Sequence, residues 1–309
     1  MNAPRVRIQR RAVHGVLLLD KPLGLSSNDA LQKAKWLLRA EKAGHTGTLD
    51  PLATGLLPLC FGAATKFSQT SLDADKRYVA TLRLGQRTAT GDAEGAVIEE
   101  REVTADRAAI DAAVARFTGA IEQCPPMFSA LKHQGRPLYD YAREGVTVER
   151  ALRPVQIHRI DILDWQSPLL VIDVNCSKGT YIRTLAEDIG AALGCGAHLA
   201  ALRRSGSGTL DVAGAVTLEA LAALDEAGRD ALLLPADQLL SSWPEVRLPD
   251  DEAGRFLSGL RRRVALADAP AVRVYGPQAR AFLGSAHICG GELIADRLLS
   301  PLEVQALIA

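Results

Sequence analysis

The 309-residue sequence has no apolar run that approaches the roughly 20 residues needed to cross a bilayer. Its N-terminal tail, residues 1–12, is basic, but no apolar block of the kind found in signal peptides follows it. These absences argue against a membrane-spanning protein and against a secreted one. We therefore expect a cytoplasmic protein with no membrane partner.

Cysteine is also scarce. The chain has five cysteines, an odd number, and they are widely spaced. They form no CxxC motif and no Cys/His pair with zinc-binding spacing. A disulfide framework and a structural zinc site are therefore not expected. The five are Cys60, Cys124, Cys176, Cys195 and Cys289.

The chain has no net charge, since 36 basic residues balance 36 acidic ones. A neutral total alone argues against nucleic acid, but the charges are segregated along the chain. Residues 132–159 carry six basic and three acidic side chains, whereas residues 92–111 carry seven acidic and two basic ones. Such a surface can bind phosphates on one face. Similar runs are equally typical of solvated faces, so charge alone does not decide between the two.

The sequence does have enough apolar content, 48%, to bury a core, and enough length for two domains. Hydrophobic periodicity predicts strands over residues 13–20, 77–84, 155–163 and 169–176, and helices over residues 26–40, 104–119, 137–144 and 180–193. After Trp243-Pro244 the apolar runs are short, at residues 264–266, 272–275, 287–289 and 293–294. We predict an α+β fold with a mixed, mostly antiparallel sheet and a small β-rich C-terminal module.

The most unusual stretch is residues 44–58, GHTGTLDPLATGLLP. Its glycines permit backbone geometry that other residues resist, so we predict a loop over residues 44–51. Asp50 precedes Pro51, which keeps Asp50 out of the helical region and projects its carboxylate from a turn. Such a carboxylate can act as a nucleophile, a general base or a metal ligand. Taken alone, an Asp-Pro pair is more often a turn former or a helix cap.

This stretch resembles the signature loop of the TruB family of RNA pseudouridine synthases, which isomerise uridine 55 in the T arm of tRNA. Four further blocks resemble the family in the expected order: KPLGLS at residues 21–26, DKRY at 75–78, PPMFSALK at 125–132 and SKGTYIR at 177–183. The resemblance is close over residues 13–245 and looser over the C-terminal part. It implies a pseudouridine synthase fold and a tRNA-modifying activity that needs base flipping.

The resemblance also implies three catalytic residues. Asp50 matches the family's nucleophile, Tyr78 matches the tyrosine that stacks on the target uracil and is proposed to remove its C5 proton, and Arg183 matches the active-site arginine. An ionised carboxylate in a dry site needs a nearby cation, and a guanidinium can pair with it in bidentate fashion. Taken alone, Tyr78 is typical of a core residue and Arg183 of a surface charge, because the buried stripe of its predicted helix omits position 183.

Further matches imply substrate-binding and supporting residues. His45 matches the histidine that fills the space left in the T loop, and Tyr181 and Leu202 match the walls of the uracil pocket. Asp92 matches an acid that is linked electrostatically to the Arg–Asp pair, although its GDAEG context is also typical of a turn. The dipeptide Lys21-Pro22 matches a motif beside the signature loop, and we expect it to support that loop.

At the domain level, the resemblance implies a catalytic domain over residues 13–245, with a thumb-like insertion over about residues 124–153 that clamps the RNA stem-loop. Residues 246–309 resemble a PUA-type module that would suit the acceptor stem of tRNA. Because the isomerisation is redox-neutral and adds no group, no cofactor and no catalytic metal are expected. We expect the protein to act on tRNA as a monomer.

Two other functions fit parts of the sequence. A non-catalytic RNA-binding or tRNA-folding protein needs no nucleophile, yet Asp50, Tyr78 and Arg183 are all present; a folding role can coexist with catalysis. A phosphohydrolase with an aspartate nucleophile needs Mg²⁺ and typically a second acid two residues later, where this chain has Leu52.

Overall fold

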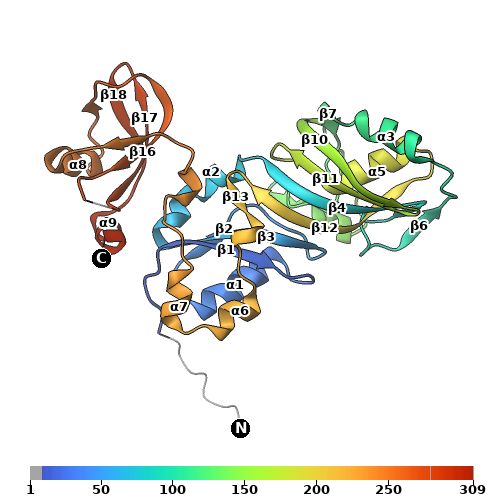
Figure 1. The fold of residues 1–309 in the computed structure, drawn as a ribbon, viewed down its shortest axis with the longest axis horizontal. Helices are drawn as coiled ribbons and strands as arrows, with labels where there is room; N and C mark the ends of the chain where they lie inside the picture. The colour runs from blue at the N-terminus through green and yellow to red at the C-terminus, as the bar shows by residue number, and fades with distance from the viewer. Residues whose placement is uncertain (1–8, 279, 309) are drawn as a thin grey trace, which may run out of the picture.

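The computed structural model describes residues 9–278 and 280–308, in which a nine-stranded sheet and a C-terminal five-stranded sheet are surrounded by helices (Figure 1). In the large sheet, β3 (Ala53–Phe61) and β12 (Ala197–Ser207) run parallel, and the other neighbouring strands pair antiparallel. The predicted α+β fold with a mixed, mostly antiparallel sheet is therefore confirmed.

The large sheet has the strand order β1-β3-β12-β4-β11-β10-β7, with β2 paired to β3 and β13 paired to β12. Two hairpins, β5–β6 and β8–β9, form separate two-stranded sheets. The remaining bounds are β1 Gly15–Lys21, β2 Ala43–His45, β4 Lys76–Leu84, β5 Gln86–Thr88, β6 Val97–Glu100, β7 Gly119–Gln123, β8 Lys132–His133, β9 Arg136–Pro137, β10 Arg153–Gln166, β11 Leu169–Cys176 and β13 Leu210–Asp211.

Helices cover the large sheet in two groups, with α1 and α6 near β1 and with α3 and α5 near β10 and β11 (Figure 1). Helix α1 (Ser27–Leu37) starts where the Ser26 hydroxyl accepts a hydrogen bond from the Asp29 amide at 3.1 Å. Helix α5 (Ile182–Ala192) buries its apolar stripe against the sheet. The other helices are α2 Ser68–Leu72, α3 Arg107–Ala115, α4 Leu138–Arg143, α6 Leu218–Ala223 and α7 Glu226–Ala231, with 3₁₀ turns at Gly62–Phe67, Val212–Gly214 and Gln238–Leu240.

Two apolar clusters of the large sheet lie under its helices, one under α1 and one under α3 and α5, and a third continues from β1 and β3 into the C-terminal module. Tyr78 and Leu202 are half-buried and pack against the first two clusters. They lie on adjacent strands, β4 and β12, at the middle of the sheet. The sequence-predicted pocket residues thus lie where these two clusters meet.

The C-terminal sheet has the order β14-β16-β17-β18-β15. Its elements are β14 Glu245–Arg247, α8 Asp250–Leu257, β15 Arg262–Arg263, β16 Ala269–Tyr275, β17 Phe282–Cys289, β18 Glu292–Leu298 and α9 Pro301–Ile308. This sheet begins at Glu245, because β14 pairs with β16, so it starts one residue before the boundary predicted at 246. The rings of Phe67 and Phe282 lie 5.1 Å apart, so the module shares apolar contacts with the rest of the chain.

Several sequence-based boundaries were wrong for local reasons. Helix α3 begins at Arg107 rather than at Thr104, because the Asp106 carboxylate accepts a hydrogen bond from the Ala109 amide and caps it. Residues 44–51 are not all loop, since Gly44 and His45 pair with β3. The short run at 264–266 is not a strand; the strand there is β15 at Arg262–Arg263.

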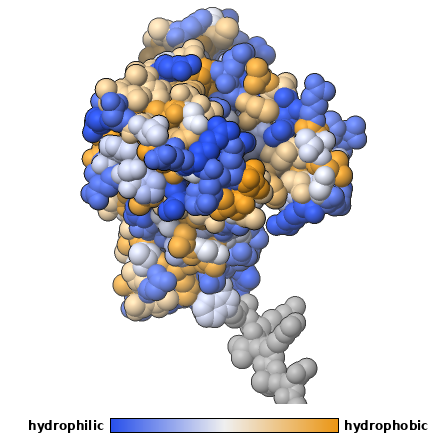
Figure 2. Space-filling model, turned by 90° about the vertical axis from the view of Figure 1, so that its right-hand side faces the viewer, coloured by the Kyte–Doolittle hydropathy of each residue, from blue (hydrophilic) through white to orange (hydrophobic). Residues whose placement is uncertain are grey.

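None of the helices in the described part of the chain is long and apolar enough to cross a membrane. At the end of the molecule that Figure 2 shows, hydrophilic and hydrophobic residues are interspersed over the surface.

Candidate active site

Asp50 lies in the turn between β2 and β3, here called the Asp50 loop (residues 46–52). The loop is fixed to α1 by Ser27, whose hydroxyl accepts a hydrogen bond from the Leu49 amide at 2.7 Å and donates to the Leu49 carbonyl at 3.0 Å. Leu49 is buried, whereas the Asp50 side chain is 46% exposed. The local sequence thus buries one side chain and presents the next, a carboxylate, at the surface of a cavity.

Gly55, at the start of β3, allows the loop to lie close to β12. Its φ is +97°, and a Cβ there would lie 2.4 Å from the backbone carbonyl oxygen of Arg204. A side chain at this position would therefore push the two parallel strands apart. The glycine in the sequence motif is explained by close backbone contact.

Arg183, in the first turn of α5, brings the predicted catalytic groups together. Its Nη2 donates to Oδ2 of Asp50 at 2.8 Å and to the Phe128 carbonyl at 2.6 Å. Its Nη1 donates to the Thr90 carbonyl at 3.3 Å and lies 3.4 Å from Oδ2 of Asp92. With its side chain 7% exposed, Arg183 is not the surface charge that the helical stripe suggested.

Asp92 is the buried member of this group, with its side chain 5% exposed. Its Oδ1 accepts hydrogen bonds from the Thr90 hydroxyl at 2.6 Å and from the Glu94 amide at 3.1 Å. Arg183 therefore divides its two terminal nitrogens between Asp92 and Asp50, and the predicted bidentate clamp on Asp50 is not formed. The guanidinium is oriented from behind by a buried acid and faces a more exposed acid in front.

A cavity of about 440 Å³ opens at this group, and it is lined by Asp50, Arg183, Asp92 and His45 together with residues of the predicted thumb. The thumb contributes Phe128, Ser129, Ala130, Tyr139 and Arg143. Tyr78, Tyr181 and Leu202 do not line this cavity. The structure therefore brings four of the nine predicted residues to one cavity, and Lys21 and Pro22 are also outside its lining.

Both tyrosines are neutral phenols in this environment. Burial raises the pKa of Tyr78, and the charge of Asp50 raises it further, while the Arg204 guanidinium opposes the shift. Burial also raises the pKa of Tyr181. Tyr181 is fixed at the start of α5, because its amide donates to Oε1 of Gln123 at 3.0 Å and its carbonyl accepts from Nε2 at 3.3 Å.

Leu202 lies between the strands that carry the site. Its register partners are Ala53 on β3 and Ala80 on β4.

His45 has a buried Nδ1 that makes no hydrogen bond to the described residues. Burial and the charge of Arg204 lower the His45 pKa, so its imidazole is neutral near pH 7.

Lys21 and Pro22 lie beneath the Asp50 loop. Lys21 is fully buried, and its Nζ donates to the Pro22 carbonyl at 2.9 Å and to the Leu25 carbonyl at 2.6 Å. Burial lowers its pKa to about 8, against the attraction of Asp50. The amide of Gly24 donates to the Pro51 carbonyl at 2.8 Å, which joins this segment to the Asp50 loop.

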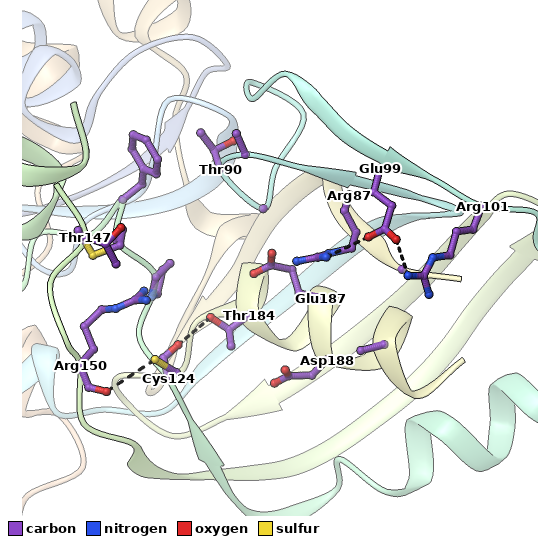
Figure 3. A pocket seen from close by; sticks show the side chains of 17 residues that line it. Arg87, Thr90, Glu99, Arg101, Cys124, Thr147, Arg150, Thr184, Glu187 and Asp188 are labelled. Atoms are coloured by element: carbon purple, nitrogen blue, oxygen red, sulfur yellow. Dashed lines mark hydrogen bonds and ion pairs between the residues drawn. The ribbon is translucent and has the colours of Figure 1, made fainter. Parts of the chain in front are cut away.

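A second cavity, of about 720 Å³, lies next to the first and shares Thr90 and Phe128 with it (Figure 3). Glu187 and Arg87 lie close together in it, and Arg150 reaches in from the predicted thumb (Figure 3). Burial raises the pKa of Glu187. Among the residues that the structure describes, no group of three or more His, Cys, Asp or Glu side chains could hold a metal ion.

Sequence reasoning missed several residues that build this site: Ser27, Thr90, Gln123 and above all Arg204. Ser27, Thr90 and Gln123 act through backbone hydrogen bonds, which no sequence motif reveals. Arg204 is 1% exposed. An arginine in an Arg-Arg pair followed by Ser-Gly-Ser gives no signal of such burial.

Comparison with known proteins gives consistent matches along the chain. A family model for the N-terminal domain of the TruB family pseudouridylate synthases matches residues 35–182. A model for the tRNA pseudouridylate synthase B C-terminal domain matches residues 183–241, and one for the C-terminal part of pseudouridine synthase II TruB matches residues 244–299.

Curated relatives are similar over almost the whole length. A tRNA pseudouridine synthase B from Verminephrobacter eiseniae (strain EF01-2) is 60% identical, with 99% of this chain and 95% of that protein covered. One from Cupriavidus metallidurans is also 60% identical, with 95% and 96% covered. A solved structure of a Cbf5-Nop10-Gar1 complex has a chain with a TM-score of 0.72 and 25% identity, covering 98% of this chain and 88% of that one.

Proposed function

Because the chain belongs to the TruB family of pseudouridylate synthases, we propose that Asp50 is the nucleophile with which it converts uridine 55 in the T arm of tRNA to pseudouridine. The enzyme is a tRNA-modifying isomerase, like the relatives at 60% identity. The observation that carries the assignment of Asp50 is its 2.8 Å contact with Arg183 at the wall of a cavity.

The reaction breaks the bond between N1 of uracil and C1′ of ribose and forms a bond between C5 and C1′. The proton on C5 is lost and N1 gains a proton, so no electrons and no atoms are added overall. Asp50 can support attack at C1′, attack at uracil C6, or a glycal intermediate. Each route needs an ionised carboxylate, and the Arg183 guanidinium favours that form.

The supporting residues act on this carboxylate and on the base. Asp92 orients Arg183, so that the guanidinium presents a fixed N–H to Asp50 when RNA displaces water from the cavity. Tyr78 stacks on the uracil and, in its ionised phenolate form, accepts the C5 proton, with Leu202 and Tyr181 as the apolar and the hydrogen-bonding wall. A neutral His45 can stack in the space that the flipped base leaves.

The substrate is the T-arm stem-loop, and the protein acts on it as a monomer without a cofactor. Positive side chains of the thumb, residues 124–153, contact its phosphates. Arg143 of this segment lines the Asp50 cavity, which supports the assignment. The PUA-like module, residues 246–309, contacts the acceptor stem through its exposed arginines.

The test is release of tritium from tRNA labelled at uridine C5. We expect release by the wild-type protein and none by Asp50→Asn, with tRNA binding retained, because the half-exposed carboxylate is not part of the core. Asp20→Asn, which alters another surface acid that pairs with an arginine, is the control and should keep its activity. Release by Asp50→Asn at the wild-type rate would contradict the assignment.

The same assay separates the two alternative functions. A non-catalytic RNA-binding protein would bind the labelled tRNA and release no tritium. A phosphohydrolase with an aspartate nucleophile would require Mg²⁺ in the catalytic step, so tritium release from folded tRNA in excess EDTA excludes it.

A further inference from the structure

Arg204, on β12, is among the largest fully buried side chains of the protein, with 1% of the residue exposed. Its Nε donates to the Leu56 carbonyl at 2.7 Å, and its Nη2 donates to the Gly47 carbonyl at 3.2 Å. No carboxylate oxygen of the described residues lies within 4.0 Å of its nitrogens. A buried cation without an acidic partner is costly, so its presence here calls for a reason.

The strand register places Arg204 between two parts of the site. On one side its antiparallel partner is Tyr78 on β4, and directly opposed residues of an antiparallel pair project from the same face. On the other side its parallel partner is Gly55 on β3, which has no side chain to occupy the space. The guanidinium extends from there to Gly47, in the Asp50 loop, where a Cβ on the glycine would lie 3.4 Å from Nη1.

We propose that Arg204 is a positioning residue for the isomerisation: it joins the Asp50 loop to Tyr78 and places a fixed positive charge beside the phenol. The proposal rests on the proposed function, in which Tyr78 accepts the C5 proton. Tyr78 can accept that proton only as a phenolate, and a guanidinium anchored by two backbone carbonyls stabilises the phenolate without reorganising during the reaction.

The charges around Tyr78 support this role. Burial raises its pKa, and Cys176 on β11 and Asp50 on the loop raise it further. Arg204 is the group that lowers it. Its charge also lowers the pKa of the buried lysines Lys21 and Lys76 and of His45, so positive potential extends beneath the whole Asp50 loop.

A purely structural role would also explain two hydrogen bonds to carbonyls, so the test must depend on the Tyr78 hydroxyl. Arg204→Gln removes the charge and keeps N–H donors. It is compared with the native protein and repeated in a Tyr78→Phe background, with single-turnover tritium release as the readout and protein in excess over tRNA. The adjacent Arg203→Gln is the control, since Arg203 is half-exposed and pairs with Asp20 at 2.7 Å.

We expect Arg204→Gln to slow single turnover by about 10- to 100-fold when Tyr78 is present and by less than threefold in the Phe background. The rate with Tyr78 present should also require a higher pH, because the phenol loses its cation. tRNA affinity should change little, and Arg203→Gln should behave like the native protein.

Arg204→Lys gives a second measure if Arg204→Gln does not fold. Lysine keeps the charge but loses the planar fork. We expect it to retain the native pH profile and to lie within about 10-fold of the native rate. An equal loss of rate in the Tyr78 and Phe backgrounds, with an unchanged pH profile, would overturn the proposal. That result differs from failure of the proposed function, in which the native protein releases no tritium or Asp50→Asn releases it normally.

Discussion

The large sheet buries charged side chains, and so does the junction between that sheet and the C-terminal module. The two regions differ in how the buried charges are neutralised. At the junction, Asp237 accepts hydrogen bonds from Tyr275 and from Arg273, whose Nη1 lies 3.1 Å away. Asp237 and Arg273 are 13% and 15% exposed in their side chains. This is a closed group in which each buried charge has a partner of opposite sign.

Beneath the Asp50 loop, by contrast, Lys21, Lys76 and Arg204 are buried with backbone carbonyls as hydrogen-bond partners. Carbonyls satisfy the donors without cancelling the charge, so a net positive potential remains next to the cavity. A closed ion pair holds two parts of a fold together, whereas uncompensated cations weaken the fold and act on what binds nearby. The two regions thus separate a structural use of buried charge from a functional one.

The largest effect is expected at Arg183, a buried cation that pairs with acids and also donates to backbone carbonyls. Arg183→Lys should lower single-turnover tritium release by about 10²- to 10³-fold, because lysine cannot reach Asp50, Asp92 and two carbonyls at once. tRNA binding should fall much less. The control is Arg203→Lys on the exposed pair with Asp20. Equal losses of turnover and binding would mean that Arg183 mainly holds RNA.

Breaking the closed group should cost stability and leave the chemistry intact. Asp237→Ala leaves Arg273 and Tyr275 without their shared acceptor, so we expect the free energy of unfolding to fall by about 3 kcal/mol, with turnover of the folded protein unchanged. Urea unfolding measures the change. Asp111→Ala, which removes an exposed helix-surface pair with Arg107, should cost under about 1 kcal/mol. Similar costs for the two variants would contradict the distinction drawn here.

The buried cations without acidic partners should make the free energy of unfolding depend on pH. Burial lowers the pKa of Lys76 from 10.5 to about 8. Between these two values the unfolded chain keeps the proton that the folded chain has lost, so the stability of the wild type rises with pH by at most about 1.4 kcal/mol per pH unit.

Lys76→Met removes this dependence while Lys21 and the tyrosines remain and cancel in the comparison. We therefore expect the wild type to gain stability relative to Lys76→Met as the pH rises from 8 toward 10, measured by urea unfolding. A difference between the two proteins that stays constant over this range would show that Lys76 keeps its proton when buried.

The smallest effect is expected on the surface of the C-terminal module. Arg261 and Arg263 are exposed, so Arg261→Ser combined with Arg263→Ser should weaken tRNA binding a few-fold and lower the slope of log K against log salt by about two. The control is Arg107→Ser on α3. Point changes are preferable to removal of the module, which would expose Phe67. An unchanged slope would show that these arginines do not contact phosphates.

How far the sequence predicted the fold depends on the kind of element. The apolar run at residues 16–19 predicted β1, and alternation predicted β4 closely, because each pattern has one stable interpretation. Strands β3 and β12 were missed. Residues 44–51 were predicted to be a loop and no strand was predicted after them, although Ala53–Phe61 is a buried strand between β1 and β12.

The site was predicted from the resemblance more than from local patterns. Periodicity identified α5 but placed Arg183 on its exposed side. The first turn of that helix is covered by the carbonyls of Thr90 and Phe128, which come from segments far away in the chain. Burial of this kind depends on what packs over a helix, and a helical stripe does not contain that information.

By itself, the sequence determined the local chemistry: which carboxylate follows a glycine-rich turn and precedes a proline, and which segments alternate or repeat with the period of a strand or helix. These are properties of neighbouring residues. Only the tertiary structure decided that Asp50 meets an arginine 133 positions later, and that Arg204 lies under the same loop without an acid beside it. Those facts depend on strand order and register, which are fixed by burial of the whole core rather than by any one stretch of chain.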